Sequence, residues 1–145
     1  MEPMTRQNVL FVCNQNSVRS PMAAALLGLR DSNGAQIDSA GLYEGGFDPF
    51  VEIVMKELDV EMNEHAPKTL SGVDIDAFDR IVALTPEAAL AIRKSAPDAC
   101  IEFWDIENPS EERGGRNAVI DAYRRVRDEL AERLRERFAE FHEKP

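Results

Sequence analysis

The stretch VLFVCNQNSVRSP, residues 9–21, decides the fold of this chain. Its first four residues are apolar and two of them are β-branched, which is typical of a strand covered on both faces in a parallel sheet. A polar segment, 13–19, follows this strand and leads into Ser20 and Pro21. Because serine is a good N-cap and proline a good first helical residue, we expect a helix from Ser20 to about Arg30.

Further strands and helices alternate along the chain. The pairs at 48–49 and 85–86 each join a capping residue to a proline, so both predict the start of a helix, and the second helix should end near Lys94. This alternation indicates βαβ units and therefore an α/β protein with a parallel sheet. The expected strands after the first are 35–39, 80–84 and 100–104.

The most regular pattern lies near the C-terminus, where apolar residues recur three and four positions apart between 119 and 141. Charged residues fill the other faces, so we expect a helix packed on the sheet with a solvated outer face. The pairs Asp121–Arg125 and Glu129–Arg133 are spaced for ion pairing along this helix.

Composition excludes several classes of protein. The chain has 145 residues and a formal net charge of −10, so we expect one domain over 1–145 and no nucleic-acid partner, since nucleic-acid binding needs clustered Lys and Arg. No run approaches the ~20 apolar residues of a membrane span, and the start of the sequence is polar, so we expect neither a membrane partner nor a signal peptide. With only Cys13 and Cys100 and no export signal, we expect reduced thiols and a cytoplasmic location.

The polar loop 13–19 combines a thiol with features that bind anions. Between a strand and a helix, successive backbone N–H groups of such a loop can form an anion nest. Arg19 adds a planar fork suited to two oxygens of a phosphate-like anion. A thiol in this field ionises readily, so Cys13 is a candidate nucleophile toward a bound tetrahedral oxyanion.

Segments throughout the chain occur in the order of one known family. They are 9–13, Asn16, 19–21, 38–41, 48–49, His65, 78–82, 103–104 and 122–130. Together they resemble the low-molecular-weight protein tyrosine phosphatase family and the arsenate reductases that share its fold. The resemblance implies a three-layer sandwich, in which helices cover both faces of a four-stranded parallel sheet. It also implies that no metal or cofactor takes part.

The resemblance implies roles for the loop residues. Cys13 would form a cysteinyl-phosphate, Arg19 would clamp the phosphate, and Ser20 would hydrogen-bond the thiolate when it acts as a leaving group. The residues that would bind the substrate are Asn14, Gln15, Asn16, Ser17 and Val18.

Three residues would support the loop. Asn16 and Ser39 would hold its shape, and His65 matches a family histidine that stabilises the same network from behind. Without the resemblance, His65 would be interpreted as a surface histidine on a polar turn.

The chain departs from the family at the general acid. The family supplies an Asp-Pro pair four residues after the tryptophan of the fourth strand, and here that place is Asn108-Pro109. Asparagine cannot donate and recover a proton, and general acid catalysis is worth roughly 10²–10⁴-fold. The acids that could substitute are Asp105, Glu107 and Glu111.

Substrate preference and redox chemistry also depart from the family. Ser110 and Glu111 replace an aromatic residue that often sorts substrates, while Tyr43 and Phe47 are candidate pocket walls. Many members carry a second loop cysteine where this chain has Val18. Residues 84–99 contain no resolving cysteine, and Cys100 starts an apolar strand, so we expect it to be a small core residue.

Three functional hypotheses remain open from the sequence. The leading one is hydrolysis of phosphate monoesters, on protein phosphotyrosine or small aryl phosphates, by a monomer or weak dimer. The alternatives are arsenate reduction with an external thiol, and phosphoprotein binding with little turnover because of Asn108.

Overall fold

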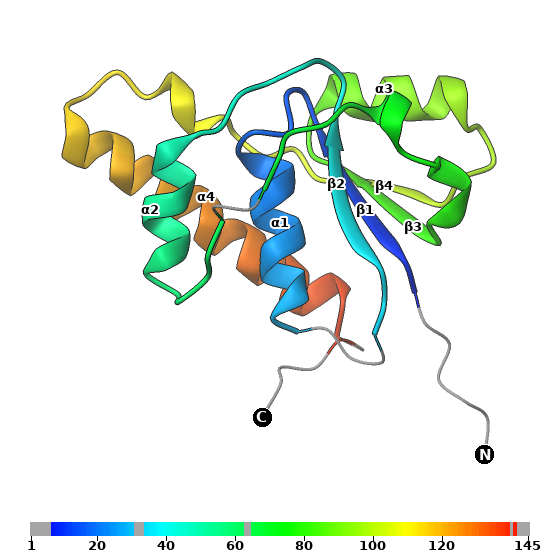
Figure 1. Ribbon diagram of the computed structural model, residues 1–145, viewed down its shortest axis with the longest axis horizontal. Helices are drawn as coiled ribbons and strands as arrows, with labels where there is room; N and C mark the ends of the chain where they lie inside the picture. The colour runs from blue at the N-terminus through cyan, green and yellow to red at the C-terminus, as the bar shows by residue number, and fades with distance from the viewer. Residues whose placement is uncertain (1–6, 31–33, 63–64, 140, 142–145) are drawn as a thin grey trace.

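The computed structural model describes residues 7–30, 34–62, 65–139 and 141, which form a parallel sheet between two layers of helices (Figure 1). Four strands lie in the order β2-β1-β3-β4, all parallel. The predicted α/β class with a four-stranded parallel sheet is confirmed. The strands are β1 (Val9–Cys13), β2 (Ile37–Gly41), β3 (Arg80–Ala83) and β4 (Ile101–Phe103).

β1 lies inside the sheet, and its side chains alternate between two hydrophobic cores. Val9, Phe11 and Cys13 belong to one core, whereas Leu10 and Val12 belong to the other. All of these side chains are buried. The unbroken apolar run in the sequence therefore reflects a strand with both faces covered.

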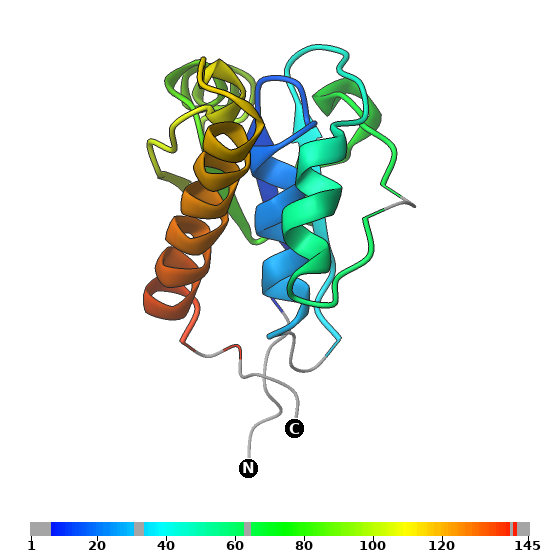
Figure 2. The same cartoon turned by 90° about the vertical axis from the view of Figure 1, so that its left-hand side faces the viewer.

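Helices cover both faces of the sheet, as the three-layer expectation requires. α1 (Arg19–Gly28), α2 (Pro49–Lys56) and α4 (Arg116–Arg137) pack on one face, where Figure 2 shows them side by side. α3 (Pro86–Ser95) covers the other face. Short 3-10 turns are η1 (Leu70–Gly72), η2 (Ile75–Ala77) and η3 (Pro109–Glu111).

Two predicted helix starts are confirmed by their capping hydrogen bonds. The Asp48 carboxylate accepts from the N–H of Phe50 at 2.9 Å, at the start of α2. The Thr85 hydroxyl accepts from the N–H of Ala88 at 3.0 Å, at the start of α3.

The predicted start of the first helix is wrong. α1 begins at Arg19, and Val18 occupies the N-cap position without a capping side chain. Ser20, the expected cap, already lies inside the helix, and its hydroxyl contacts the thiol of Cys13. A local capping pattern was thus overridden by a contact across the loop.

Cys100 is exposed, which corrects the prediction of a buried core cysteine. β4 begins one residue later, at Ile101, and is an edge strand with partly exposed residues. An edge strand is covered less completely than a central one, so its apolar run is a weaker sign of burial. β2 likewise begins later than predicted, at Ile37.

One of the two ion pairs predicted on the last helix is present. Glu129 and Arg133 approach to 3.5 Å. Asp121 instead pairs with Arg124 at 2.8 Å, because Arg125 is directed toward acids near η3 and lies 3.9 Å from Glu112. Exposed charges choose among several partners, and spacing alone does not decide which.

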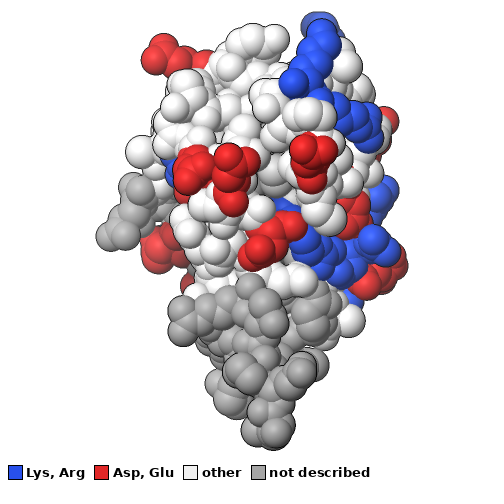
Figure 3. All heavy atoms as spheres, turned by 90° about the vertical axis from the view of Figure 1, so that its right-hand side faces the viewer, with Lys and Arg blue, Asp and Glu red and all other residues white. Residues whose placement is uncertain are grey.

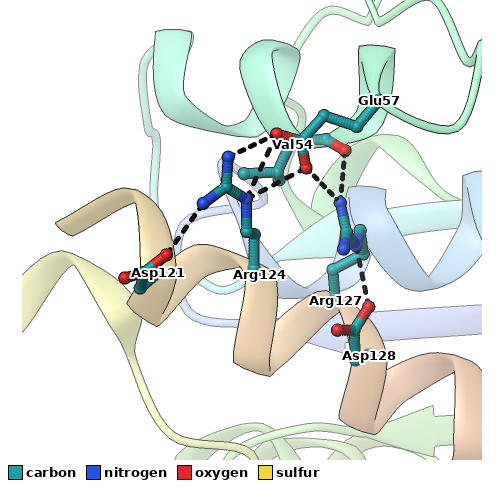
Figure 4. A network of polar contacts seen from close by, with 6 residues as sticks. All are labelled: Val54, Glu57, Asp121, Arg124, Arg127 and Asp128. Carbon is teal, nitrogen blue, oxygen red and sulfur yellow. Dashed lines mark hydrogen bonds and ion pairs between the residues drawn. The ribbon is translucent and has the colours of Figure 1, made fainter. Parts of the chain in front are cut away.

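A polar network joins α2 to α4 (Figure 4). Glu57, directly after α2, accepts hydrogen bonds from Arg124 at 2.6 Å and from Arg127 at 2.7 Å. Arg127 is buried and also donates to the carbonyl of Val54 at 2.8 Å. Hydrogen bonds from Arg124, and next from Arg127, lower the pKa of Glu57 to about 2.

Asp and Glu side chains are distributed over the face that Figure 3 shows rather than gathered in one patch. Acidic side chains there form several small groups over the face, and most of the basic side chains lie toward one edge, next to further acidic ones. Within the described part of the chain, no helix is long and apolar enough to span a membrane.

Candidate active site

The loop between β1 and α1 lies at the carboxyl end of the sheet (Figure 1). The segment after β2 fixes its start, since Leu42 and Tyr43 both donate their N–H groups to the carbonyl of Asn14, at 2.7 and 2.8 Å. Gly41 permits this approach, because a Cβ there would lie 2.7 Å from the amide nitrogen of Asn16. The loop and the end of β2 therefore pack backbone against backbone.

Asn16 holds the centre of the loop. It is fully buried, and its φ of 55° lies in the left-handed region that asparagine tolerates better than most residues. Its side chain accepts from the N–H of Lys68 at 3.0 Å and donates to Ser20 Oγ at 2.9 Å. His65 Nε2 lies 2.9 Å from the Asn16 carbonyl oxygen. The structure thus brings together Asn16 and His65, as the family resemblance implies for one supporting network.

The thiol of Cys13 contacts the first turn of α1. Its Sγ lies 2.9 Å from Ser20 Oγ, and both side chains are buried. Ser20 Oγ also donates to the carbonyl of Ala40 at 3.3 Å. Because a hydroxyl has one proton to donate, Ser20 can direct it at this carbonyl or at a sulfur anion. Ser39, the remaining predicted support, is buried in β2 next to Ala40.

Arg19 stands at the other end of the loop, as the first residue of α1. Its Nη1 donates to the carbonyl of Ile106 at 3.0 Å. A guanidinium has five N–H donors, so this bond orients the group with one of them. Arg19 is thereby tied to the segment that leads from β4 to Asn108.

Cys13, Arg19 and other residues of the loop line a surface hollow of about 520 Å³, whereas Asn16 and Ser20 are fully buried and are not among its lining residues. Tyr43 and Phe47 form part of its wall and are 61% and 51% exposed. Of the described residues that line it, only Arg19 and Asp48 carry a formal charge. The other lining residues are Cys13, Asn14, Gln15, Ser17, Val18, Gly46, Asn108 and Ser110.

Asn108 lines this hollow with a side chain that also caps η3. Its Oδ1 accepts from the N–H and the hydroxyl of Ser110, at 3.0 and 2.7 Å. Its amide can donate hydrogen bonds but supplies no proton for catalysis. Asp105, Glu107 and Glu111 line a second hollow instead, and none of them is among the described residues that line the first.

Two residues of the site were predicted only as helix caps. Thr85 Oγ1 donates to Asn14 Oδ1 at 2.8 Å and so links the end of β3 to the loop. Asp48 lines the hollow although it lies far from the loop in sequence. A capping pattern accounts for each residue completely, so nothing local signals a second contact. For Thr85, its position just beyond the carboxyl end of the parallel strand β3 was the available signal.

The fold and the site define an α/β protein in which a cysteine at the end of the first strand and an arginine at the start of the first helix flank one polar loop. Residues 8–145 match the family described as low molecular weight phosphotyrosine protein phosphatase. The chain belongs to this family.

Its relatives include two kinds of enzyme. An arsenate reductase of Bacillus licheniformis is 27% identical over 137 residues, which cover 94% of this chain and 98% of the relative. A protein-arginine-phosphatase of Geobacillus stearothermophilus is 34% identical over 140 residues, which cover 91% and 93%. The crystal structure of an arsenate reductase from Archaeoglobus fulgidus has a TM-score of 0.70 and 30% identity, covering 89% of this chain and 97% of that one.

Proposed function

We propose that this chain is a phosphatase that acts through a cysteinyl-phosphate on Cys13. The observation that supports this most is the 2.9 Å separation of Cys13 Sγ, at the end of β1, and Ser20 Oγ, in the first turn of α1, where Arg19 also lies. A sulfur anion that attacks and later leaves is stabilised by a hydroxyl donor beside it. Arg19 supplies positive charge and planar donors for phosphoryl oxygens.

The reaction would proceed in two displacements at phosphorus. In the first, the Cys13 thiolate attacks, an S–P bond forms, and the leaving group departs with the electron pair of the broken bond. In the second, water attacks phosphorus and loses a proton, and the S–P bond breaks to release inorganic phosphate. Cys13 leaves as a thiolate, which Ser20 stabilises with its hydroxyl proton, while Arg19 holds the phosphoryl oxygens throughout.

Asn108 limits which leaving groups the proposed reaction could release, because an asparagine cannot protonate them. Without a carboxylic acid at that position, groups that depart without an added proton are favoured. Aryl phosphates, including phosphotyrosine, meet this condition better than alkyl phosphates do. A protonated phosphoguanidine meets it too, because it already carries the proton with which a neutral guanidine departs. The relative named as a protein-arginine-phosphatase supports this second substrate class. We therefore infer phosphotyrosine or phosphoarginine in proteins, or small aryl phosphates, as substrates in the cytoplasm.

Arsenate reduction is the second candidate, favoured by the relatives of that name. It requires a thiol that releases the product from Cys13. Cys100 precedes β4, at the opposite end of the sheet from Cys13. The two positions lie roughly 13 Å apart along the strands alone, whereas a disulfide needs Cα atoms within about 7 Å. An arsenate reductase built on this chain would depend on an external thiol.

Turnover of para-nitrophenyl phosphate tests the proposed reaction. Cys13→Ser should lower kcat by more than about a thousandfold, whereas Cys100→Ser, the matched control, should retain wild-type kcat. Unchanged turnover in Cys13→Ser would overturn the proposal. Arsenite formation with glutathione, glutaredoxin or thioredoxin, in the absence of phosphate release from any ester, would favour the second candidate.

A further inference from the structure

We propose that Asp48, held by Tyr123, forms a cation subsite in the active-site hollow, which Tyr43 and Phe47 also line. This inference rests on the proposed phosphatase function and adds a substrate class to it. The preferred substrates would carry a guanidinium or ammonium group close to the phosphoryl group.

The Asp48 carboxylate is fixed by two donors on different elements. Its Oδ1 accepts from the N–H of Phe50 at 2.9 Å, and its Oδ2 accepts from the hydroxyl of Tyr123 at 2.7 Å. Tyr123 is buried in α4, with its ring 5.4 Å from that of Phe50. Burial, and next the hydrogen bond to Asp48, raise the pKa of Tyr123, so its hydroxyl keeps the proton that it donates.

This arrangement makes Asp48 an acceptor rather than a proton donor. Both oxygens accept hydrogen bonds, and a carboxylate has about four lone-pair sites, so each oxygen keeps capacity for a further donor. Asp48 is half-buried and lines the hollow. A negative charge is therefore held in place at the wall, ready to accept N–H donors from a bound molecule.

The charges of the hollow are arranged for a substrate with two opposite charges. Arg19 is the cation on the side of the loop, and Asp48 is the anion on the side of α2. When Arg19 binds the phosphoryl group of a substrate, a positive group elsewhere on the same substrate would lie in the hollow with Asp48. A phosphate dianion alone would be repelled by this carboxylate, so Asp48 contributes to binding only when the substrate carries a positive group.

Two aromatic rings strengthen this assignment. Tyr43 and Phe47 line the hollow and are largely exposed, although large aromatic side chains are usually covered. Exposed rings and a carboxylate in one hollow are the groups that bind guanidinium and quaternary ammonium ions, through cation–π attraction together with charge. Phe47 directly precedes Asp48 in the chain, and both residues line the hollow.

An isosteric pair of aryl phosphates tests the subsite. One carries a trimethylammonium group on the ring and the other a tert-butyl group, which has the same shape without the charge. The readout is the ratio of kcat/KM for the cationic substrate to that for the neutral one. We expect Asp48→Asn to lower this ratio about tenfold. Tyr123→Phe should lower it less, because the Asp48 carboxylate keeps its charge but loses the hydrogen bond that fixes its position.

Glu44→Gln is the matched control, since Glu44 is an exposed acid of the same segment and is not among the described lining residues. It should leave the ratio at the wild-type value. If Asp48→Asn lowered kcat/KM for both substrates equally, Asp48 would be only a structural cap and the proposal would be overturned.

A binding measurement separates this inference from the proposed reaction. Phosphocholine and its neutral isostere, in which tert-butyl replaces trimethylammonium, are titrated into the wild-type protein, and no turnover is needed. Tighter binding of phosphocholine supports the subsite even if no ester is hydrolysed, and equal or weaker binding overturns it. Peptides with phosphoarginine, or with phosphotyrosine beside arginine, then identify the natural source of the cation. If Asp48→Asn weakens the binding of either peptide, the subsite is supported. If it weakens the binding of neither peptide, the subsite is contradicted.

Discussion

Asn108 caps a turn but cannot act as the general acid expected at its position. Its Oδ1 caps η3 through two hydrogen bonds with Ser110, and aspartate serves equally well as a cap. Asn108→Asp should therefore preserve the turn and add a proton donor to the hollow. We expect kcat for phenyl phosphate, which has a poorer leaving group than para-nitrophenyl phosphate, to rise roughly 10–100-fold, and kcat for para-nitrophenyl phosphate to rise much less.

The measurement for Asn108→Asp is the slope of log kcat against the pKa of the leaving phenol. A shallower slope in the variant than in the wild type is expected. Ser110→Ala is the control, since it removes one hydrogen bond of the cap and supplies no acid. Equal acceleration of all esters would show that the new carboxylate acts on something other than the leaving group.

At the residue scale, a site residue could be predicted where the loop sequence itself carries it, but not where packing brings it in from another element. The loop residues 13–19 and Ser20 lie consecutively in the chain, so their shared site could be inferred from strand, loop and helix alone. Asp48 reaches the same hollow from the start of α2. Its neighbours predict a cap and nothing more, and only the packing of α2 against α4 places its carboxylate at the pocket.

At the scale of elements, the end of β2 sets the shape of the loop. A Cβ on Gly41 would meet backbone atoms of Gln15 and Asn16 at 2.8 and 2.7 Å, and backbone cannot rotate away as a side chain can. Gly41→Ala should cost about 1–3 kcal/mol of unfolding free energy and should lower kcat/KM further by displacing the loop. Urea unfolding and steady-state kinetics measure the two effects.

Gly72→Ala is the control for Gly41→Ala, because nothing lies within 4 Å of its Cβ. It should leave kcat/KM unchanged. Wild-type kinetics in Gly41→Ala would contradict the view that backbone contact with β2 holds the loop in its active shape.

The network between α2 and α4 makes a prediction about pH. Arg124 and Arg127 hold the pKa of Glu57 at about 2 in the folded protein, against an ordinary value of 4.5. A carboxylate with a lowered folded pKa stabilises the fold above its unfolded pKa and loses that contribution as the pH falls through its folded pKa. Glu57→Gln should therefore be less stable than wild type at neutral pH, with a difference that shrinks between about pH 4.5 and pH 2.

Denaturant unfolding of wild type and Glu57→Gln at neutral pH and at about pH 3 measures this change. Glu136→Gln, an exposed acid on α4, is the matched control and should show little difference at either pH. A difference for Glu57→Gln that is the same at both pH values would mean that packing, not charge, carries the effect.

The elements themselves could be predicted from periodicity, since each strand and helix carries its own pattern. Their ends could not, because ends respond to distant contacts. Ser20 contacts Cys13 instead of capping α1. The apolar residues after Cys100 predicted that it would be buried in the fourth strand, but it lies just before this edge strand and is exposed. These corrections share one cause, which is that tertiary packing outweighs local preference at boundaries.

At the scale of the whole molecule, the net charge of −10 has to be reconciled with an anion site. The first thirty residues, which contain the loop, carry three bases and one acid. The acid surplus lies elsewhere and is scattered on the face that Figure 3 shows. Arg19 and the loop act over a few ångströms, whereas the surplus acts over the Debye length, about 10 Å at 0.1 M salt.

The long-range field of the surplus acids predicts opposite responses to salt for substrates of opposite charge. For a strongly acidic phosphopeptide, long-range repulsion slows the encounter, so kcat/KM should rise about threefold or more between about 20 and 200 mM salt. For a phosphopeptide with flanking arginines, screening removes attraction, and kcat/KM should fall. Para-nitrophenyl phosphate serves as the control, since it is small and should change least. If kcat/KM for the acidic peptide fell with salt instead, the local positive charge of the loop would outweigh the surplus acids at encounter distance.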